Sequence, residues 1–306
     1  MTISVRATAY GGPEVLAIVD DPVGDPGPGE VRVALRAAGV NPIDYKLYSG
    51  LLGADPAALP MSLGLEGSGV IEAVGPDVEL TVGTEVVVYP ASGTYAAALV
   101  TSAESVLPKP AGVSFEQAAG LLLCGATAVH AIDATKVGEG DTVLVHGAAG
   151  GVGQAVVQLA VRRGARVIGT ASERNHDLLR ELGAEPVVYG DGLADRVRAL
   201  APDGVDVALD LVGGEEALRV SLDLVADRGR IATIANFAAA ALGVTVLGGM
   251  GDDARVRAAA RPELLRLASE GALKVRIANT YPLTDVAEAH RVIKEGHTVG
   301  KIVLTI

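Results

Sequence analysis

The sequence is poor in aromatic residues and in cysteine. Its 306 residues include no Trp, only two Phe and seven Tyr, although 49% of them are hydrophobic. The interior must therefore be built from Ala, Val, Leu and Ile. The single cysteine, Cys124, excludes an internal disulfide and a multi-cysteine zinc site. Such cysteine usage is typical of a protein of the reducing cytoplasm.

Basic residues and long apolar runs are scarce as well. Lys and Arg total 25 against 37 Asp and Glu, which gives a net charge of −12. Nucleic acids and anionic membranes attract basic surfaces, so neither is expected as a partner. The longest mostly apolar run, residues 237–250, is too short and too rich in glycine to span a bilayer, and no export signal is visible at the N-terminus. We therefore expect a cytoplasmic protein.

A glycine-rich stretch in the middle of the chain predicts a nucleotide-binding turn. The run Thr142–His146 is typical of a buried strand, and apolar residues from 152 to 160 recur at the spacing of one helix face. Between them, glycines let the backbone approach a dinucleotide pyrophosphate, to which the helix N-terminus offers free N–H groups. Ala148 stands where the usual fingerprint has its first glycine, and the alternative is a tight turn in another α/β domain. The residues predicted to hold the phosphates are Gly147, Ala148, Gly150, Gly151, Val152 and Gly153.

The end of the next strand predicts which dinucleotide binds. An NAD site usually carries Asp or Glu about 20 residues after the glycines. Here Ala171 holds that place, directly after Thr170 at the end of the expected strand. Ser172 and Arg174 follow, and a hydroxyl and a guanidinium suit the 2′-phosphate of NADPH. We therefore expect NADPH, bound near Thr170, Ser172 and Arg174; the alternative is that Ser172 only caps a helix over residues 173–182 and that Arg174 is solvated.

Turn clusters and periodicity divide the chain into two lobes. Residues 1–110 carry many short strand-like segments separated by Gly and Pro clusters, which is typical of a barrel or sandwich. From Ser114 onward strands alternate with helices, which predicts an α/β lobe with a parallel doubly wound sheet. The segments after residue 273 have no place in that sheet and are expected to return to the first lobe. The predicted domains are residues 1–113 with 273–306, and residues 114–272.

Within the second lobe the alternation can be assigned in detail. A short segment at 244–247 is predicted to add an edge strand that could pair across the axis of a homodimer, or else be an ordinary edge strand. The other expected strands are Thr142–His146, Arg166–Thr170, 186–189, 205–210 and 230–234, and the expected helices are 154–163, 173–182, 193–200 and 215–224.

Four separated motifs resemble one known family. Their order and spacing are similar to those of the medium-chain dehydrogenases/reductases, and most of all to the zinc-free quinone oxidoreductases and enone reductases. The resemblance implies a GroES-like β-barrel catalytic lobe, a Rossmann lobe, and a cleft between them for nicotinamide and substrate. The motifs are Pro-Gly-Glu at 28–30 with Gly-Val-Asn-Pro-Ile-Asp at 39–44, Gly-Leu-Glu-Gly-Ser-Gly-Val-Ile at 64–71, Ala-Ala-Gly-Gly-Val-Gly at 148–153, and Gly-Lys-Ile-Val-Leu at 300–304.

The chain departs from the zinc-dependent members of that family at their metal ligands. Asn41 stands where the zinc alcohol dehydrogenases carry cysteine, and Leu65 where they carry histidine; the third ligand aligns near Leu123, beside Cys124. These residues cannot make the open three-ligand site that a catalytic Zn²⁺ needs. Without a Lewis acid, alcohol oxidation loses its alkoxide stabiliser, whereas hydride donation to an activated acceptor remains feasible.

The same resemblance implies three catalytic residues. Asn41 would bind the nicotinamide ribose or an acceptor carbonyl, or it is simply a turn asparagine before Pro42. Lys46 would polarise an enolate oxygen, or it is a surface lysine. Thr127, in a Gly-Ala-Thr segment, would pack near the nicotinamide, or it supplies a helix-start hydroxyl.

Further candidates stand at the ends of the predicted strands, which face the cofactor in such sheets. Asp210 ends one strand, Asn236 follows another, and Tyr189 could flank the adenine; Asp210 could instead only order its turn. His130 and His146 are expected to be structural.

The expected activity is therefore zinc-independent, NADPH-dependent transfer of hydride to a quinone or an α,β-unsaturated carbonyl. Catalysis would rest mainly on positioning the two reactants. One alternative is an enoyl-thioester reductase of a biosynthetic pathway. Another is a non-catalytic protein that keeps NADPH as a sensing or structural ligand.

Overall fold

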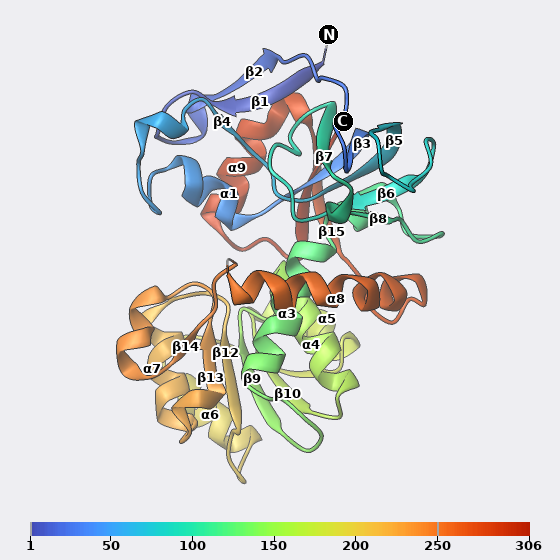
Figure 1. The fold of residues 1–306 in the computed structure, drawn as a ribbon. Coiled ribbons are helices and arrows are strands. Elements are labelled where there is room, and N and C mark those ends of the chain that lie inside the picture. Colours follow the sequence, from blue (N-terminus) through green and yellow to red (C-terminus); the bar gives the residue numbers. More distant parts are fainter. Residues whose placement is uncertain (1, 250) are drawn as a thin grey trace. The chain divides into compact units, whose positions relative to one another are not determined.

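The computed structural model describes residues 2–249 and 251–306, so Met1 of the first expected domain and Met250 at the end of the apolar run lie outside it. The chain forms two compact units. Unit 1 comprises residues 1–123 and 265–306, and unit 2 comprises residues 124–264. Figure 1 shows that unit 1 contains both the blue and the red ends of the chain.

The unit boundaries lie at 123/124 and 264/265 rather than at the expected 113/114 and 272/273, because one helix before the first boundary belongs with unit 1 and the second boundary falls inside helix α8 (Asp252–Ser269). Helix α2 (Phe115–Ala119) begins at a capping box in which Ser114 Oγ accepts from the Gln117 N–H at 3.2 Å. It packs against strands β3 (Glu30–Val40), β5 (Gly67–Val74) and β16 (Lys301–Thr305) of unit 1.

Unit 1 is mostly β-structure, as the many short strand-like segments predict. Its larger sheet has the order β15-β16-β3-β5-β6-β8, with β7 also paired to β3. Strand β16 lies antiparallel to β3, so the end of the chain does return to this unit. The remaining strands and helices of the unit are β1 (Ile3–Ala7), β2 (Leu16–Asp20), β4 (Met61–Ser62), β6 (Glu85–Val88), β7 (Ala98–Ser102), β8 (Val106–Pro108), β15 (Ile277–Pro282), α1 (Pro42–Tyr48) and α9 (Val286–Glu295).

Unit 2 has the predicted parallel doubly wound sheet. The strand order is β11-β10-β9-β12-β13-β14, and every neighbouring pair is parallel. The order reverses between β9 and β12, which makes this the switch point of the sheet. The strands are β9 (Thr142–His146), β10 (Arg166–Thr170), β11 (Ala184–Val187), β12 (Val207–Asp210), β13 (Ile231–Thr233) and β14 (Thr245–Val246).

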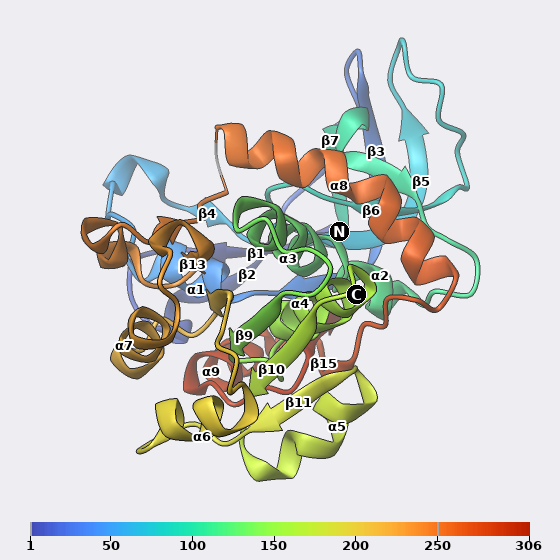
Figure 2. The same ribbon diagram turned by 90° about the horizontal axis from the view of Figure 1, so that it is seen from below.

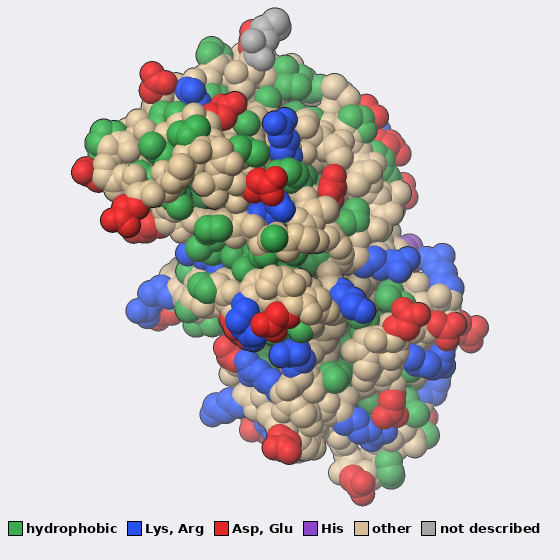
Figure 3. All heavy atoms as spheres, turned by 90° about the vertical axis from the view of Figure 1, so that its right-hand side faces the viewer, with side chains coloured by type: hydrophobic (Ala, Val, Ile, Leu, Met, Phe, Trp, Pro, Cys, Tyr) green, Lys and Arg blue, Asp and Glu red, His purple; other side chains and the backbone are tan. Residues whose placement is uncertain are grey.

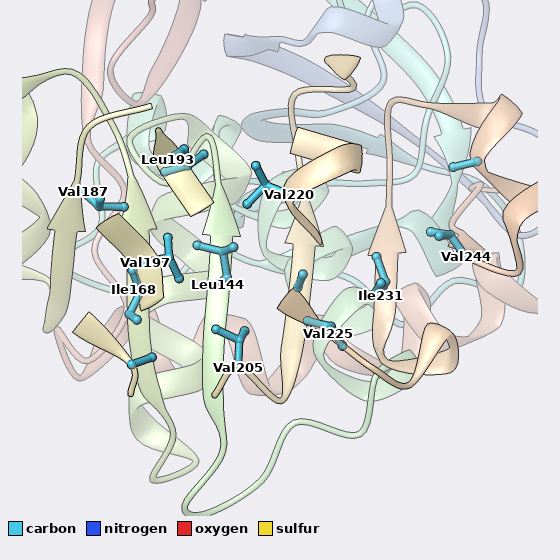
Figure 4. Packing of buried hydrophobic residues seen from close by; sticks show 13 residues of the cluster. Leu144, Ile168, Val187, Leu193, Val197, Val205, Val220, Val225, Ile231 and Val244 are labelled. Atoms are coloured by element: carbon cyan, nitrogen blue, oxygen red, sulfur yellow. The ribbon is translucent and has the colours of Figure 1, made fainter. Parts of the chain in front are cut away.

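Helices cover both faces of this sheet. Helix α4 (Gly151–Arg162) packs on β9 and β10, while α6 (Leu193–Leu200) and α7 (Glu215–Leu224) pack on the opposite face (Figure 2). Figure 4 shows Leu193 and Val197 of α6 and Val220 of α7 lying over Leu144 and Ile168 of the strands. This buried cluster contains only Leu, Ile, Val and Ala, as the scarcity of aromatic residues requires.

Several helices lie outside the predicted set. Helix α1 was not foreseen, helix α3 (Leu122–Ala134) contains Thr127 five residues after its start, and α8 (Asp252–Ser269) contains Pro262. The expected helix 173–182 is a 3₁₀ turn at Glu173–Asn175 followed by α5 (His176–Glu181). Within residues 2–249 and 251–306, none of the helices combines the length and apolarity needed to cross a bilayer.

Candidate functional site

The turn after β9 has the geometry that a bound pyrophosphate requires. Gly147 adopts φ +76°, a left-handed conformation that favours glycine. A Cβ on Gly153 would lie 2.2 Å from Gly147 O and 2.7 Å from Ala148 Cα, so only glycine lets α4 start this close to the strand. Gly150 precedes the helix without a capping side chain, so the first N–H groups of α4 keep no side-chain partner there.

Ala148 replaces the first glycine of the fingerprint because Gly169 makes room for it. A Cβ on Gly169 would lie only 2.8 Å from Ala148 Cβ. The absence of a side chain at Gly169 therefore leaves the space that the methyl group of Ala148 occupies. The Ala148 N–H donates to Thr170 O at 3.1 Å, and the Gly147 N–H donates to Thr170 Oγ1 at 3.1 Å. Thr170 therefore holds the turn through its hydroxyl.

The ends of β9 and β12 meet at the switch point. Asp210 lies opposite His146 in the register, and both are buried. The Asp210 carboxylate accepts from the N–H groups of Val212 (2.9 Å) and Gly213 (2.8 Å) and from Thr233 Oγ1 (3.0 Å). These contacts correspond to the alternative in which Asp210 orders its turn. Burial lowers the pKa of His146 to about 4, and its Nε2 lies 3.2 Å from Ser221 Oγ.

The residues expected at the 2′-phosphate lie just after β10. Ala171 is buried, whereas Arg174 is exposed and has no hydrogen bond or ion pair to the described part of the chain. Ser172 makes no capping bond, and its Oγ accepts from Asn175 Nδ2 at 3.1 Å. The helix-capping alternative for Ser172 is therefore not seen. Tyr189, two residues after the end of β11, is 48% exposed and available for stacking.

Three further residues of unit 2 take the following places. Asn236 precedes a 3₁₀ helix after β13 and donates its N–H to Thr233 Oγ1 at 3.1 Å. Thr127 is buried inside α3, so its role as a helix-start hydroxyl is wrong, because the helix begins at Leu122. His130 Nε2 lies 3.3 Å from Asp253 Oδ1, and burial lowers the pKa of its imidazole.

In unit 1, Asn41 is buried immediately before α1, and its side-chain amide is hydrogen-bonded within the protein. Its Nδ2 donates to Glu66 Oε1 at 3.1 Å and to Gly39 O at 3.3 Å, and its Oδ1 accepts from Lys301 Nζ at 2.5 Å. Both N–H groups are used, so only the second lone pair of Oδ1 remains. Asn41 can therefore accept one more hydrogen bond but has none left to donate.

The partners of Asn41 form a buried ion pair. Lys301 Nζ lies 3.0 Å from Glu66 Oε1, and the two side chains are 5% and 0% exposed. Glu66 Oε2 accepts from the Leu123 N–H at 2.8 Å, and Val40 O accepts from Lys301 Nζ at 3.3 Å. Two glycines make the space: a Cβ on Gly39 would lie 2.6 Å from Glu66 Oε1, and one on Gly120 would lie 3.2 Å from the Lys301 side chain.

Helix α1 carries Lys46, the other catalytic candidate of this unit. Lys46 is half-buried, and its ammonium has no hydrogen bond or ion pair among the described residues. Sequence reasoning missed the roles of Glu66 and Lys301, although both stand inside the motifs that carried the family resemblance. The usable signal was a charged residue within a glycine-rich, otherwise apolar motif.

The position that corresponds to the catalytic zinc site of the zinc alcohol dehydrogenases does not suit a metal ion in this protein. Asn41 uses its amide within the protein, Leu65 offers no donor atom, and Glu66 is paired with Lys301. In the described ranges no cluster of three or more His, Cys, Asp or Glu side chains has the geometry of a metal site.

Comparisons with known proteins agree with this architecture. Residues 27–127 match the alcohol dehydrogenase GroES-like domain, and residues 182–304 match the zinc-binding dehydrogenase family. The chain is 36% identical to a quinone oxidoreductase of Pseudomonas aeruginosa, with 99% of both chains covered, and 34% identical to a 2-haloacrylate reductase of a Burkholderia species, with 96% of both covered.

A solved structure gives the same result. Escherichia coli quinone oxidoreductase in complex with NADPH superimposes with a TM-score of 0.89 at 30% identity, and all of both chains is covered. The resemblance inferred from the four motifs and the expected fold class are confirmed. The chain belongs to the medium-chain dehydrogenase/reductase family, within its quinone oxidoreductase group.

Proposed function

We propose that this protein is an NADPH-dependent oxidoreductase that transfers hydride to a quinone or an α,β-unsaturated carbonyl without a metal ion. The observation that carries the proposal is the nucleotide turn of unit 2, followed at the end of β10 by Ala171, Ser172 and the unpaired Arg174. Relatives named as a quinone oxidoreductase and a 2-haloacrylate reductase support both classes of acceptor.

The residues of unit 2 bind and select the cofactor. Gly147 and Gly153 keep the turn open to the pyrophosphate, which accepts from the first N–H groups of α4. Arg174 pairs with the 2′-phosphate, and Ser172 donates its hydroxyl to the same group. Tyr189 flanks the adenine, while Thr170 and Asp210 hold the two turns that surround the cofactor. Thr127 and Asn236 line the nicotinamide end.

The residues of unit 1 act on the reacting groups. NADPH, when bound, supplies the hydride. Lys46 offers its unpaired ammonium to the acceptor oxygen, on which negative charge develops as hydride arrives. Asn41 accepts a hydroxyl of the nicotinamide ribose, since its amide retains only an acceptor position. It therefore does not polarise the acceptor carbonyl, and that role belongs to Lys46.

The proposal extends to assembly and environment. The edge strand β14 is short and has a free side in the order of the sheet, which suits pairing with a second copy in a homodimer. Acidic and basic side chains are interspersed on the face shown in Figure 3, and the net charge is −12, so a small-molecule acceptor in the cytoplasm is favoured over a nucleic acid.

The test follows the oxidation of NADPH and, in parallel, NADH with a benzoquinone, a 2-haloacrylate and an enoyl thioester. We expect turnover with NADPH and one of the first two acceptors. Faster turnover of the thioester would favour an enoyl reductase, and NADPH binding without any turnover would favour a sensing or structural protein.

A single substitution tests the preference for NADPH over NADH. R174A should raise the dissociation constant of NADPH by roughly 10- to 100-fold, because a charge-assisted phosphate contact is lost, and should leave that of NADH nearly unchanged. R180A is the matched control, since Arg180 is also exposed, lies on the next helix and pairs with Asp177. An equal effect of R174A on both cofactors would refute the assignment.

A further inference from the structure

Two residues of helix α1 are connected by a chain of hydrogen bonds through side chains outside the helix. Because the two residues are one turn apart on α1, the chain and the helix together form a closed ring. Tyr48 OH lies 2.9 Å from His290 Nδ1, and His290 Nε2 lies 3.4 Å from Tyr95 OH. Tyr95 OH in turn donates to Asp44 Oδ2 at 2.7 Å. Asp44 and Tyr48 are one turn apart on α1, and all four side chains are buried.

The ring has one consistent direction of donation. Burial lowers the pKa of His290 to about 4, so its neutral ring has one donor and one acceptor nitrogen. When Asp44 is ionised, the Tyr95 hydroxyl donates to its carboxylate, so the Tyr95 oxygen accepts from His290 Nε2–H. His290 Nδ1 then accepts from Tyr48 OH. Every hydroxyl and ring N–H is used, so no member can turn without breaking a buried hydrogen bond.

A second contact fixes the start of the same helix. Asp44 Oδ2 also accepts from the Asn41 N–H at 2.8 Å, which closes the first turn of α1. The His290 ring also packs against both tyrosines. Its centroid lies 5.4 Å from that of the Tyr48 ring and 5.7 Å from that of the Tyr95 ring. A helix of seven residues is too short to be stable alone, so these contacts determine its position.

Lys46 lies on the other side of this clamped helix. Lys46 is two positions along the chain from both Asp44 and Tyr48, which places it about 160° around the helix from each of them. Lys46 is half-buried and its ammonium has no partner in the described chain, whereas Asp44 Oδ2 and the Tyr48 hydroxyl on the opposite face are hydrogen-bonded. The arrangement holds one face of α1 rigidly and leaves the cation of the other face open to a ligand.

We propose that Tyr95, His290 and Tyr48 are positioning residues that fix the Lys46 ammonium against the acceptor oxygen during hydride transfer. The inference rests on the proposed function, since it assigns Lys46 to the acceptor. The acceptor class that follows is one that gathers negative charge on oxygen, as both quinones and α,β-unsaturated carbonyls do.

The test removes one tyrosine hydroxyl at a time from the hydrophobic cluster that contains the ring. Y95F and Y48F each open the ring, whereas Y281F removes a hydroxyl from a tyrosine that packs on the same hydrophobic cluster outside the ring. We expect kcat with the preferred acceptor to fall roughly 10-fold in Y95F and Y48F and to stay within about twofold in Y281F, with the NADPH KM unchanged in all three. Assays at about pH 8 keep Asp44 ionised.

A double-variant series separates positioning from general loss of structure. K46M should lower kcat by about 100-fold, as removal of an oxyanion stabiliser does. In the K46M background Y95F should have no further effect, because the group it positions is absent. Independent, multiplying effects of Y95F and K46M would overturn the inference, as would equal activity of Y95F and Y281F.

Failure of the proposed function looks different. In that case the wild-type protein would oxidise no NADPH with any acceptor, and the variants would have no reaction to affect. Circular dichroism and thermal unfolding identify a variant that does not fold. If Y95F is such a variant, Y48F applies the same test from the other end of the ring.

Discussion

The buried ion pair of unit 1 gives a sharp prediction about stability. K301M keeps most of the volume of the lysine side chain in the space above Gly120 but removes its charge. Glu66, at 0% exposure, is then left as a carboxylate in the interior without its cation. The loss of one partner of such a pair typically costs about 3–5 kcal/mol, because the remaining charge stays buried and uncompensated.

The remaining contacts of Glu66 place the expected value within that range. After the substitution Glu66 keeps two neutral donors, Asn41 Nδ2 at 3.1 Å and the Leu123 N–H at 2.8 Å. These bonds satisfy part of the carboxylate, so we expect a loss of about 3 kcal/mol in the free energy of unfolding. The double variant E66Q/K301M leaves no unpaired charge and should lose less than K301M alone.

The assay is chemical denaturation followed by circular dichroism for the wild type, K301M, E66Q and the double variant. K294M is the matched control, because Lys294 is an exposed lysine on α9 and should change the free energy by less than about 0.5 kcal/mol. A K301M loss below about 1 kcal/mol, or additive losses in the double variant, would refute the reasoning.

Two more predictions concern the nucleotide turn and the buried histidines. G153A should abolish measurable NADPH binding by fluorescence titration while the protein stays folded, because its methyl group would lie 2.2 Å from Gly147 O and would push α4 away from the turn; unchanged affinity would show that the turn is not the site. The pKa values of His146 and His290 are lowered to about 4 in the fold from 6.5, so the unfolded chain binds protons more readily. Their contribution to stability is present above pH 6.5 and is lost as the pH falls towards 4, by up to about 3 kcal/mol for each histidine. Burial raises the pKa of Asp44 from 3.8 to about 7, so Asp44 favours the folded state as the pH falls and opposes the effect of the histidines. In D44N the free energy of unfolding should therefore decrease more steeply from pH 7 to pH 5; a shallower decrease would contradict these assignments.

Local patterns predicted the nucleotide-binding part well. The strand Thr142–His146, the glycine turn and the following helix depend on contacts within about twenty residues, and all three stand as expected. The parallel doubly wound sheet also followed, because alternating strands and helices leave few topologies open. Ala148 could be placed from the sequence, but its compensation by Gly169 needed the register of β10 against β9.

The polar interior of unit 1 could not be predicted in the same way. Lys301 and Glu66 are 235 residues apart, and nothing local shows that a lysine near the end of the chain enters the core beside Asn41. The ring through Tyr48, His290 and Tyr95 likewise joins segments that are distant in sequence. Helix α1 was missed for the same reason: seven residues form it only because tertiary contacts hold them.

Unit 1 is built from two segments that are separated in the sequence, and this sets the order in which its contacts can form during synthesis. Strand β3 pairs with β16, and Glu66 pairs with Lys301, so neither β16 nor Lys301 is available until all of unit 2 has been translated. At about 5–20 residues per second, Glu66 waits on the order of tens of seconds for its cation. Throughout that interval residues 37–40 of β3, which later pair with β16, are an unpaired edge that can bind other chains. Nascent unit 1 is thus the part of this protein that would depend most on chaperones, whereas unit 2, which is continuous in sequence, can fold as soon as it leaves the ribosome.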